Sequence, residues 1–211
     1  MNSLAPHRAR IGMTLIELIV ALTITGLAVG SGYSAYATLA DRRIVADREA
    51  DDIARTSAIR STLESWIAAA RLTIEQDDIV FRSVDGTRRS LDSATPDDDL
   101  TFFTSARTLV GNHGTVVHLF VDHDSTGDRG LIAELSEWPG VRHTRIQIDS
   151  TVASFDVSVL SSVLGAQSWL PSWVSATILP AGVRVTLRAR MGDSLPPLLR
   201  RPITVSLENG R

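Results

Sequence analysis

Hydrophobic and polar positions are distributed unevenly along the chain. Between Arg10 and Asp41 the only charged residue is Glu17, and the segment from Met13 to Gly30 is otherwise almost wholly apolar. In a helix that rises about 1.5 Å per residue, some twenty such residues match a hydrocarbon core of roughly 30 Å. The pattern therefore predicts a membrane-spanning helix near the N-terminus.

Helical spacing continues beyond the apolar segment. There is no Gly or Pro between Asp41 and Glu75. Apolar side chains recur at steps of three and four residues, at Ile59, Leu63, Trp66, Ile67, Ala70 and Ile74. We expect one helix from about Met13 to Glu75, with the apolar stripe of its second half packed on a globular head.

Beyond Gln76 the pattern changes to short β-rich runs separated by turn residues. The strands expected are Ile79–Val84, Thr87–Leu91, Leu100–Thr104, Thr115–Val121, Leu131–Leu135, Val141–Ile148, Val152–Val159, Val183–Arg190 and Ile203–Leu207. We expect the first two to form a hairpin around Asp85-Gly86, and Thr95–Asp99 to form a loop. The fold class predicted is α+β, with a long N-terminal helix and an antiparallel β-sheet head of one domain.

Composition narrows the classes of function. The chain has 211 residues, 21% charged and 44% hydrophobic, so it is neither a disordered polyampholyte nor a polytopic membrane protein. A net charge of −3 argues against a general nucleic-acid binder. The absence of cysteine removes disulfide frameworks, zinc knuckles, iron–sulfur clusters and thiol catalysis.

The apolar segment has two ordinary interpretations. It can be a signal anchor, whose basic flank of Arg8 and Arg10 favours a cytoplasmic N-terminus. It can also be a secretory signal cleaved at the small residues Ala35-Tyr36-Ala37. Neither explains Glu17, because a carboxylate in the membrane costs about 2–3 kcal/mol on insertion scales and usually marks function.

A third interpretation explains the carboxylate. The run Gly12-Met13-Thr14-Leu15-Ile16-Glu17 closely resembles the class III prepilin signal of type IV pilins and type II secretion pseudopilins. The resemblance implies that a membrane peptidase cuts after Gly12, that Met13 becomes the N-methylated first residue, and that Glu17 pairs with the N-terminal amine of a neighbouring subunit. Members of the family most often begin with Phe, where this chain has Met13.

The resemblance also implies a domain organisation. Residues 1–12 would be a cleaved leader peptide, 13–40 a transmembrane and fibre-core helix, and 41–211 a periplasmic pilin-like head. The chain would then be a single-pass protein of the bacterial inner membrane, with its N-terminus in the cytoplasm.

The C-terminal third resembles one branch of the superfamily. Phe155–Val159, a tryptophan-containing segment from Trp169 to Trp173, and Leu179–Leu187 follow one another as in the J subunit (GspJ) of type II secretion. This resemblance implies a minor pseudopilin at the tip of a short fibre, which primes assembly and supports protein export but performs no catalysis. Implied partners are other minor pseudopilins, the major pseudopilin, the prepilin peptidase and the inner membrane, without nucleic acid.

Two alternatives stand beside this assignment. The nearer is a minor pilin of a type IV pilus (PilW-like). The other is a membrane-anchored periplasmic enzyme or binding protein, which should show a catalytic cluster or a ligand pocket.

One segment has the composition of a metal loop. Asp122, Asp124 and Asp128 alternate around Gly127, and such carboxylates can surround Ca²⁺. The acid expected at the twelfth position of an EF-hand loop is replaced by Ala133. The alternative is a solvated hairpin. No other cofactor is expected.

The remaining polar clusters are expected to be structural. Asp97-Asp98-Asp99 follows a proline and is expected to be a solvated turn. His118 lies in an alternating strand, where a packed or surface histidine is expected. No nucleophile elbow or helical metal-binding histidine pair is present in the sequence. The four tryptophans can serve an interface, and core packing is expected for at least two of them.

Overall fold

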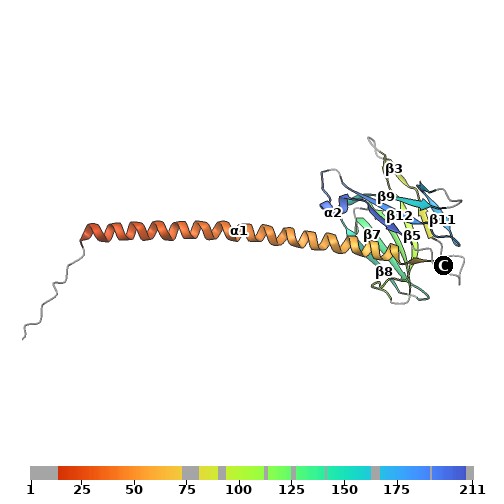
Figure 1. Cartoon of the computed structure of the whole chain (residues 1–211), viewed down its shortest axis with the longest axis horizontal. Coiled ribbons are helices and arrows are strands. Elements are labelled where there is room, and N and C mark those ends of the chain that lie inside the picture. Colours follow the sequence, from red (N-terminus) through yellow and green to blue (C-terminus); the bar gives the residue numbers. More distant parts are fainter. Residues whose placement is uncertain are drawn as a thin grey trace, which may run out of the picture. The chain divides into compact units, whose positions relative to one another are not determined.

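The structure is a computed structural model and describes residues 14–72, 81–89, 94–111, 114–124, 127–140, 142–162, 167–190 and 192–207 (Figure 1). The chain divides into two compact units, Met1–Asp51 and Asp52–Arg211.

The first unit contains most of one long helix, α1 (Leu15–Ala68). A window of 18 residues in this helix has a mean hydropathy of 1.9, and none of that window is buried against the rest of the protein. The helix is therefore long and apolar enough to cross a membrane, as the sequence pattern predicts.

In the second unit the end of α1 packs into the head. Leu63, Trp66 and Ile67 are buried, and Ile59 packs against the same core. Their spacing of three and four residues places them on one face of the helix. The predicted apolar stripe is confirmed for these residues and for Ala70, which is buried beyond the helix end; Ile74 lies outside the described residues.

The predicted end of the helix at Glu75 is wrong. The helix ends at Ala68, and Ala70–Arg71 form strand β1, paired with β5 (Asp99–Thr104). Thr104 Oγ1 donates a hydrogen bond of 2.8 Å to the carbonyl of Trp66, and the Ser105 N–H donates one of 3.1 Å to the carbonyl of Ala69. Because β5 and the residue after it satisfy these terminal carbonyls, the chain leaves the helix early.

Three antiparallel sheets account for the strands of the described residues. The largest has the order β11 (Trp173–Ser175), β2 (Phe81–Val84), β5, β6 (Thr115–Asp122), β7 (Gly130–Glu137) and β8 (His143–Asp149), with β1 added on β5. The second has the order β10 (Ser168–Leu170), β9 (Val152–Ser161), β12 (Gly182–Ala189) and β13 (Ile203–Ser206). The third is the ribbon of β3 (Thr87–Arg89) and β4 (Ala94–Pro96), and one short helix, α2 (Pro197–Arg200), precedes β13. This long helix and antiparallel head confirm the predicted α+β, pilin-like fold.

The hairpin predicted between Ile79–Val84 and Thr87–Leu91 is wrong. Strand β2 pairs with β5 and β11, whereas β3 pairs with β4. Strand β2 buries Phe81 and Ser83, so it joins the large sheet, but all three residues of β3 are exposed. A strand without an apolar face gains little from that sheet.

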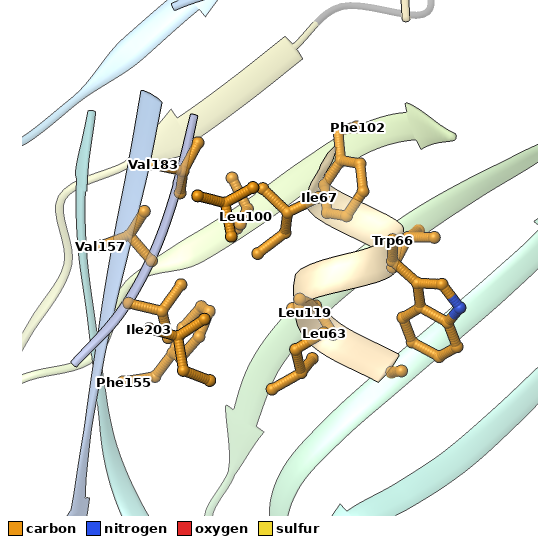
Figure 2. Close-up of a cluster of buried hydrophobic side chains, with 14 of the residues drawn as sticks. Leu63, Trp66, Ile67, Leu100, Phe102, Leu119, Phe155, Val157, Val183 and Ile203 are labelled. Atoms are coloured by element: carbon orange, nitrogen blue, oxygen red, sulfur yellow. The ribbon is translucent and has the colours of Figure 1, made fainter. Parts of the chain in front are cut away.

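One hydrophobic core joins the helix to both large sheets (Figure 2). The side chains labelled there are Leu63, Trp66 and Ile67 of α1, Leu100, Phe102 and Leu119 of the seven-stranded sheet, and Phe155, Val157, Val183 and Ile203 of the four-stranded sheet. The end of α1 is therefore an integral part of the head.

Candidate functional site

The start of α1 has the geometry of a helix cap. Thr14 precedes the first helical residue, and the Glu17 N–H donates to Thr14 Oγ1 at 3.4 Å and to the Thr14 carbonyl at 3.1 Å. Thr followed three residues later by Glu is the sequence pattern of a capping box. This structural role was not among the predictions above, although the T-x-x-E pattern of Thr14 and Glu17 is a local signal for it.

Glu17 also stands alone among apolar side chains. Its neighbours Ile16 and Leu18 are exposed, and so are most apolar residues of the first unit. Gly12 and Met13, the predicted cleavage and methylation site, lie outside the described residues. Their roles therefore stay predictions.

A groove of about 520 Å³ lies in the head beside the end of α1. One wall is the helix, with Ile59, Leu63 and Trp66 among its lining residues. The groove is also lined by Ile146 and Ile148 of β8 and by the loop residues Arg107, Thr108 and Leu109. Arg55 also lines the groove, so its lining is mainly apolar with two arginines.

The groove could not be read from the sequence. Its lining comes from three segments about forty residues apart along the chain, and only folding brings them together. The edge position of β8 in its sheet leaves the side chains of Ile146 and Ile148 half-buried, which makes this side of the groove apolar.

The candidate calcium loop is tied to the adjacent sheet. Asp122 Oδ1 accepts the Asp124 N–H at 2.8 Å, and Arg145 donates to the other oxygen of Asp122. Arg145 also donates to Glu134 Oε1 at 3.1 Å. Asp128 is described but joins no group of three His, Cys, Asp or Glu suited to a metal among the described residues. The calcium site therefore stays a prediction, and the cation nearest Asp122 is Arg145.

His118 lies beside Arg145, since both side chains contact Glu134. Its Nε2 lies 3.1 Å from Asp99 Oδ1 and its Nδ1 lies 3.6 Å from Glu134 Oε2. The imidazole stacks on the Phe120 ring, with centroids 4.7 Å apart. His118 is thus a surface histidine, as expected.

The solvated turn predicted at Asp97-Asp98-Asp99 is wrong. Asp98 is only 3% exposed, and its two carboxylate oxygens accept the N–H groups of Gly86 at 2.9 Å and Val157 at 2.7 Å. Asp97 Oδ1 lies 2.9 Å from Nε2 of His123 and accepts a hydrogen bond when this ring nitrogen carries the proton. The segment is a junction between the sheets.

Burial dominates the electrostatics of Asp98. It raises the pKa of this carboxyl from 3.8 to about 6, and the neighbouring carboxylates of Asp156 and Asp85 add to the rise. The hydrogen bonds from Val157 and Gly86 oppose it. The junction thus holds a carboxylate whose charge is disfavoured by its surroundings.

The tryptophans divide between core and surface. Trp66 is buried, and Trp173 packs against the core with its Nε1–H donating to the Ile178 carbonyl at 3.2 Å. These two confirm the expected core packing. Trp169 is more exposed, and the Arg184 guanidinium lies 3.9 Å from the centroid of its ring.

Comparison with known proteins decides the class of the N-terminal segment. The family model for the prokaryotic N-terminal methylation motif matches residues 7–33. This match supports a pilin-like protein. No curated protein matches the chain.

The matched range contains Gly12, Met13 and Glu17, the residues on which the prepilin resemblance rests. Together with the apolar helix, the motif supports anchoring in the inner membrane by a single span. It also supports assembly with other pilin-like subunits after processing by a prepilin peptidase, which is a structural rather than a catalytic role.

Proposed function

We propose that this pilin-like chain is a minor pseudopilin of a type II secretion system. In this proposal the peptidase removes residues 1–12, the N-terminus lies in the cytoplasm and the head lies in the periplasm. The subunit joins other minor pseudopilins and the major pseudopilin, forms part of the fibre tip, and supports protein export across the outer membrane.

The observation that carries an assembly role is the isolation of Glu17. It is the only charged residue between Arg10 and Asp41, on a helix whose apolar side chains are exposed. A carboxylate in that position is unfavourable in a single subunit within lipid. Its benefit is explained by a positive charge from a neighbour, and cleavage after Gly12 would supply one as the Met13 amine.

The choice of secretion over a type IV pilus rests on the C-terminal third. The segments that resemble the J subunit lie in and around β9, β10 and β12, and these strands belong to one sheet of the head. This order supports the pseudopilin assignment and leaves a PilW-like minor pilin as the alternative outcome of the test.

Processing and phenotype together test the proposal. The chain recovered from membranes should begin at Met13, as determined by intact mass or N-terminal sequencing. Deletion of the gene should stop export of type II substrates, and the wild-type chain should restore it. A mature chain that begins at Thr38 would refute processing at Gly12, whereas lost twitching or DNA uptake with normal export would favour the pilus alternative.

A further inference from the structure

Strand β8 has the longest open edge among the strands that the structure describes. It is the last strand of the seven-stranded sheet and has seven residues, with β7 as its one neighbour in the described part of the chain. The other outer strands of the two large sheets, β10, β11 and β13, have three, three and four residues. A long open edge presents a row of unpaired N–H and C=O groups, with which an extended chain can pair.

The hydrogen bonds between β7 and β8 show which groups of β8 are open. At the turn that joins the two strands, the Glu137 N–H donates to the Arg142 carbonyl at 2.9 Å. Residues bonded in this way alternate along an antiparallel pair, and the register of β8 is continuous from His143 to Gln147. The backbone groups that face the open side are therefore those of His143, Arg145 and Gln147.

The charged side chains near this edge are held back on the sheet. Arg145 donates to Asp122 of β6 and to Glu134 of β7. Arg142 donates to both carboxylate oxygens of Glu137, at 2.7 and 3.0 Å. Strand β8 contains neither proline nor lysine, the residues that commonly block the open edges of sheets. The edge is therefore accessible to a partner strand.

One face of β8 adds an apolar requirement. Ile146 and Ile148 line the groove beside the end of α1 and are half-buried, and Leu109 in the same groove is 77% exposed. A strand paired with β8 places every second side chain on the face of these isoleucines. Aliphatic side chains at those positions would cover apolar surface that the head leaves open.

The charge of the groove selects a carboxylate on the same face of the partner. Of the two arginines that line the groove, Arg55 has Asp51 and Asp52 within one helical turn, which partly offsets its charge. Arg107 is exposed, the run Leu100–Val121 around it contains no acidic residue, and it forms no ion pair with the described residues. A carboxylate beside the aliphatic side chains therefore complements Arg107.

We propose that β8 binds an extended segment of another protein as an added antiparallel strand. The segment alternates aliphatic with polar residues and carries a carboxylate beside the aliphatic ones. The open backbone groups select a strand over a helix, because a helix uses its own N–H and C=O groups internally. The inference concerns the head alone and goes beyond the proposed function, since it does not depend on the fibre or on export.

A short synthetic peptide tests this pairing. The probe is acetylated Asp-Thr-Val-Thr-Ile-Thr-Glu with a dye at its C-terminus, and its fluorescence anisotropy is measured on the full chain in lipid nanodiscs. In the proposed pairing its threonines lie opposite His143, Arg145 and Gln147 and bond to their backbone groups. A probe N-methylated at the threonines should bind at least about tenfold more weakly, whereas N-methylation at valine and isoleucine should change the affinity by less than about twofold.

Variants of the chain supply a second measurement. Arg145→Pro removes an N–H that faces the open side, a position at which an edge strand tolerates proline. Arg145→Ala is the matched control, because it removes the same side chain and keeps the N–H. The probe should bind Arg145→Pro at least about tenfold more weakly and Arg145→Ala within about twofold of the wild-type chain. Arg107→Glu should weaken binding, and a probe with lysine in place of its acids should restore it.

Several results would overturn the proposal. They are binding no stronger than to empty nanodiscs, no saturation at millimolar probe, and equal or reversed effects of the two methylation patterns, which would assign the affinity to side chains alone or to another register. If circular dichroism shows that Arg145→Pro is unfolded, the methylated probes decide. Processing at Gly12 and export are measured without the probe, so an exporting chain that fails to bind it refutes strand addition alone.

Discussion

The buried carboxylate of Asp98 accepts the backbone N–H of Val157 at 2.7 Å, and thereby fastens the segment before β5 to the middle of β9. Its other oxygen accepts the N–H of Gly86, and the Asp97 backbone forms a parallel bridge with Phe155. One side chain therefore holds three segments that are distant in sequence. Its ionisation has a consequence for the stability of the head.

Head stability should depend on the titration of Asp98. Its pKa in the folded protein, about 6, lies above the ordinary value of 3.8, so the folded state binds the proton more tightly. The free energy of unfolding should therefore rise as pH falls from 7 towards 4, with a contribution from this group of about 3 kcal/mol. Urea denaturation followed by tryptophan fluorescence measures it, because all four tryptophans lie in the second unit.

The control is Asp98→Asn, which cannot titrate. Its amide oxygen can accept one of the two N–H groups, and its amide nitrogen cannot accept the other, so the variant should lose about 1–3 kcal/mol at pH 5. The loss should be smaller at pH 7.5, where the wild-type chain carries the buried charge. Parallel pH profiles for the two chains would contradict a raised pKa.

Two buried serines should respond oppositely to the same substitution. Ser83 is fully buried, and its Oγ has no hydrogen-bond partner among the residues that the structure describes. Ser154 is 2% exposed and its Oγ donates to the Pro96 carbonyl at 2.7 Å. Ser83→Ala should be neutral or stabilise the head by about 1 kcal/mol, whereas Ser154→Ala should cost about 1–3 kcal/mol. Chemical denaturation measures the free energy of unfolding of both variants. A substantial loss of stability for Ser83→Ala would mean that the Ser83 hydroxyl forms a hydrogen bond in solution.

The packing of α1 on the head predicts an independently folding fragment. A chain that begins at Asp41 should be soluble and unfold cooperatively, because the second unit begins at Asp52. Leu63→Ala should cost it about 2–5 kcal/mol as a large-to-small change in the core. Leu109→Ala is the matched control, since that leucine is exposed, and should change stability by less than about 0.5 kcal/mol. Similar losses for both variants would contradict the burial of Leu63.

Calcium binding at Asp122, Asp124 and Asp128 would have to compete with Arg145. Arg145 donates to Asp122, so a cation that uses this carboxylate must displace the guanidinium or share the oxygen. We expect Arg145→Ala to tighten calcium binding and Asp122→Asn to abolish it. Isothermal titration calorimetry on the purified chain measures both. If neither the wild-type chain nor Arg145→Ala binds calcium at millimolar concentration, the loop is a structural hairpin.

Local sequence patterns were sufficient to predict the elements whose buried residues recur with helical or strand periodicity. The stripe of Leu63, Trp66 and Ile67 follows helical spacing, and its burial is confirmed. The alternation in Val183–Leu187 likewise matches the pattern of β12, in which Val183, Val185 and Leu187 are buried. In both, the residues that decide the structure lie within a few positions of one another.

Long-range contacts determine the features of the fold that local sequence patterns did not predict. An Asp-rich segment after a proline has the same composition whether it is solvated or buried. Here Asp98 can be buried because its carboxylate oxygens accept the N–H groups of Gly86 and Val157. Likewise, α1 ends early because Thr104 and Ser105 bind its last carbonyls. Neither partner can be identified from local sequence.

Glu17 has two explanations that one pair of variants separates. The first is local: its backbone N–H is held by Thr14, in a capping-box pattern that also favours a carboxylate in the first turn of the helix. The second is intermolecular: its charge pairs with the Met13 amine of a neighbour after cleavage. Gln serves a capping box as well as Glu does, but it carries no charge.

If charge pairing dominates, Glu17→Gln and Glu17→Ala should both lower the recovery of partner subunits from membranes and reduce export. Removing one member of an ion pair in a low-dielectric environment costs about 3–5 kcal/mol, so the loss should be severalfold or greater. Thr14→Ala is the matched control, because it removes the cap and keeps the charge. It should leave assembly nearly intact. Membrane insertion and cleavage, measured by fractionation and intact mass, should stay unchanged in all three chains. A defect in Glu17→Ala and Thr14→Ala that is absent in Glu17→Gln would instead assign Glu17 to its own helix, and the assembly contact would have to lie elsewhere on the subunit.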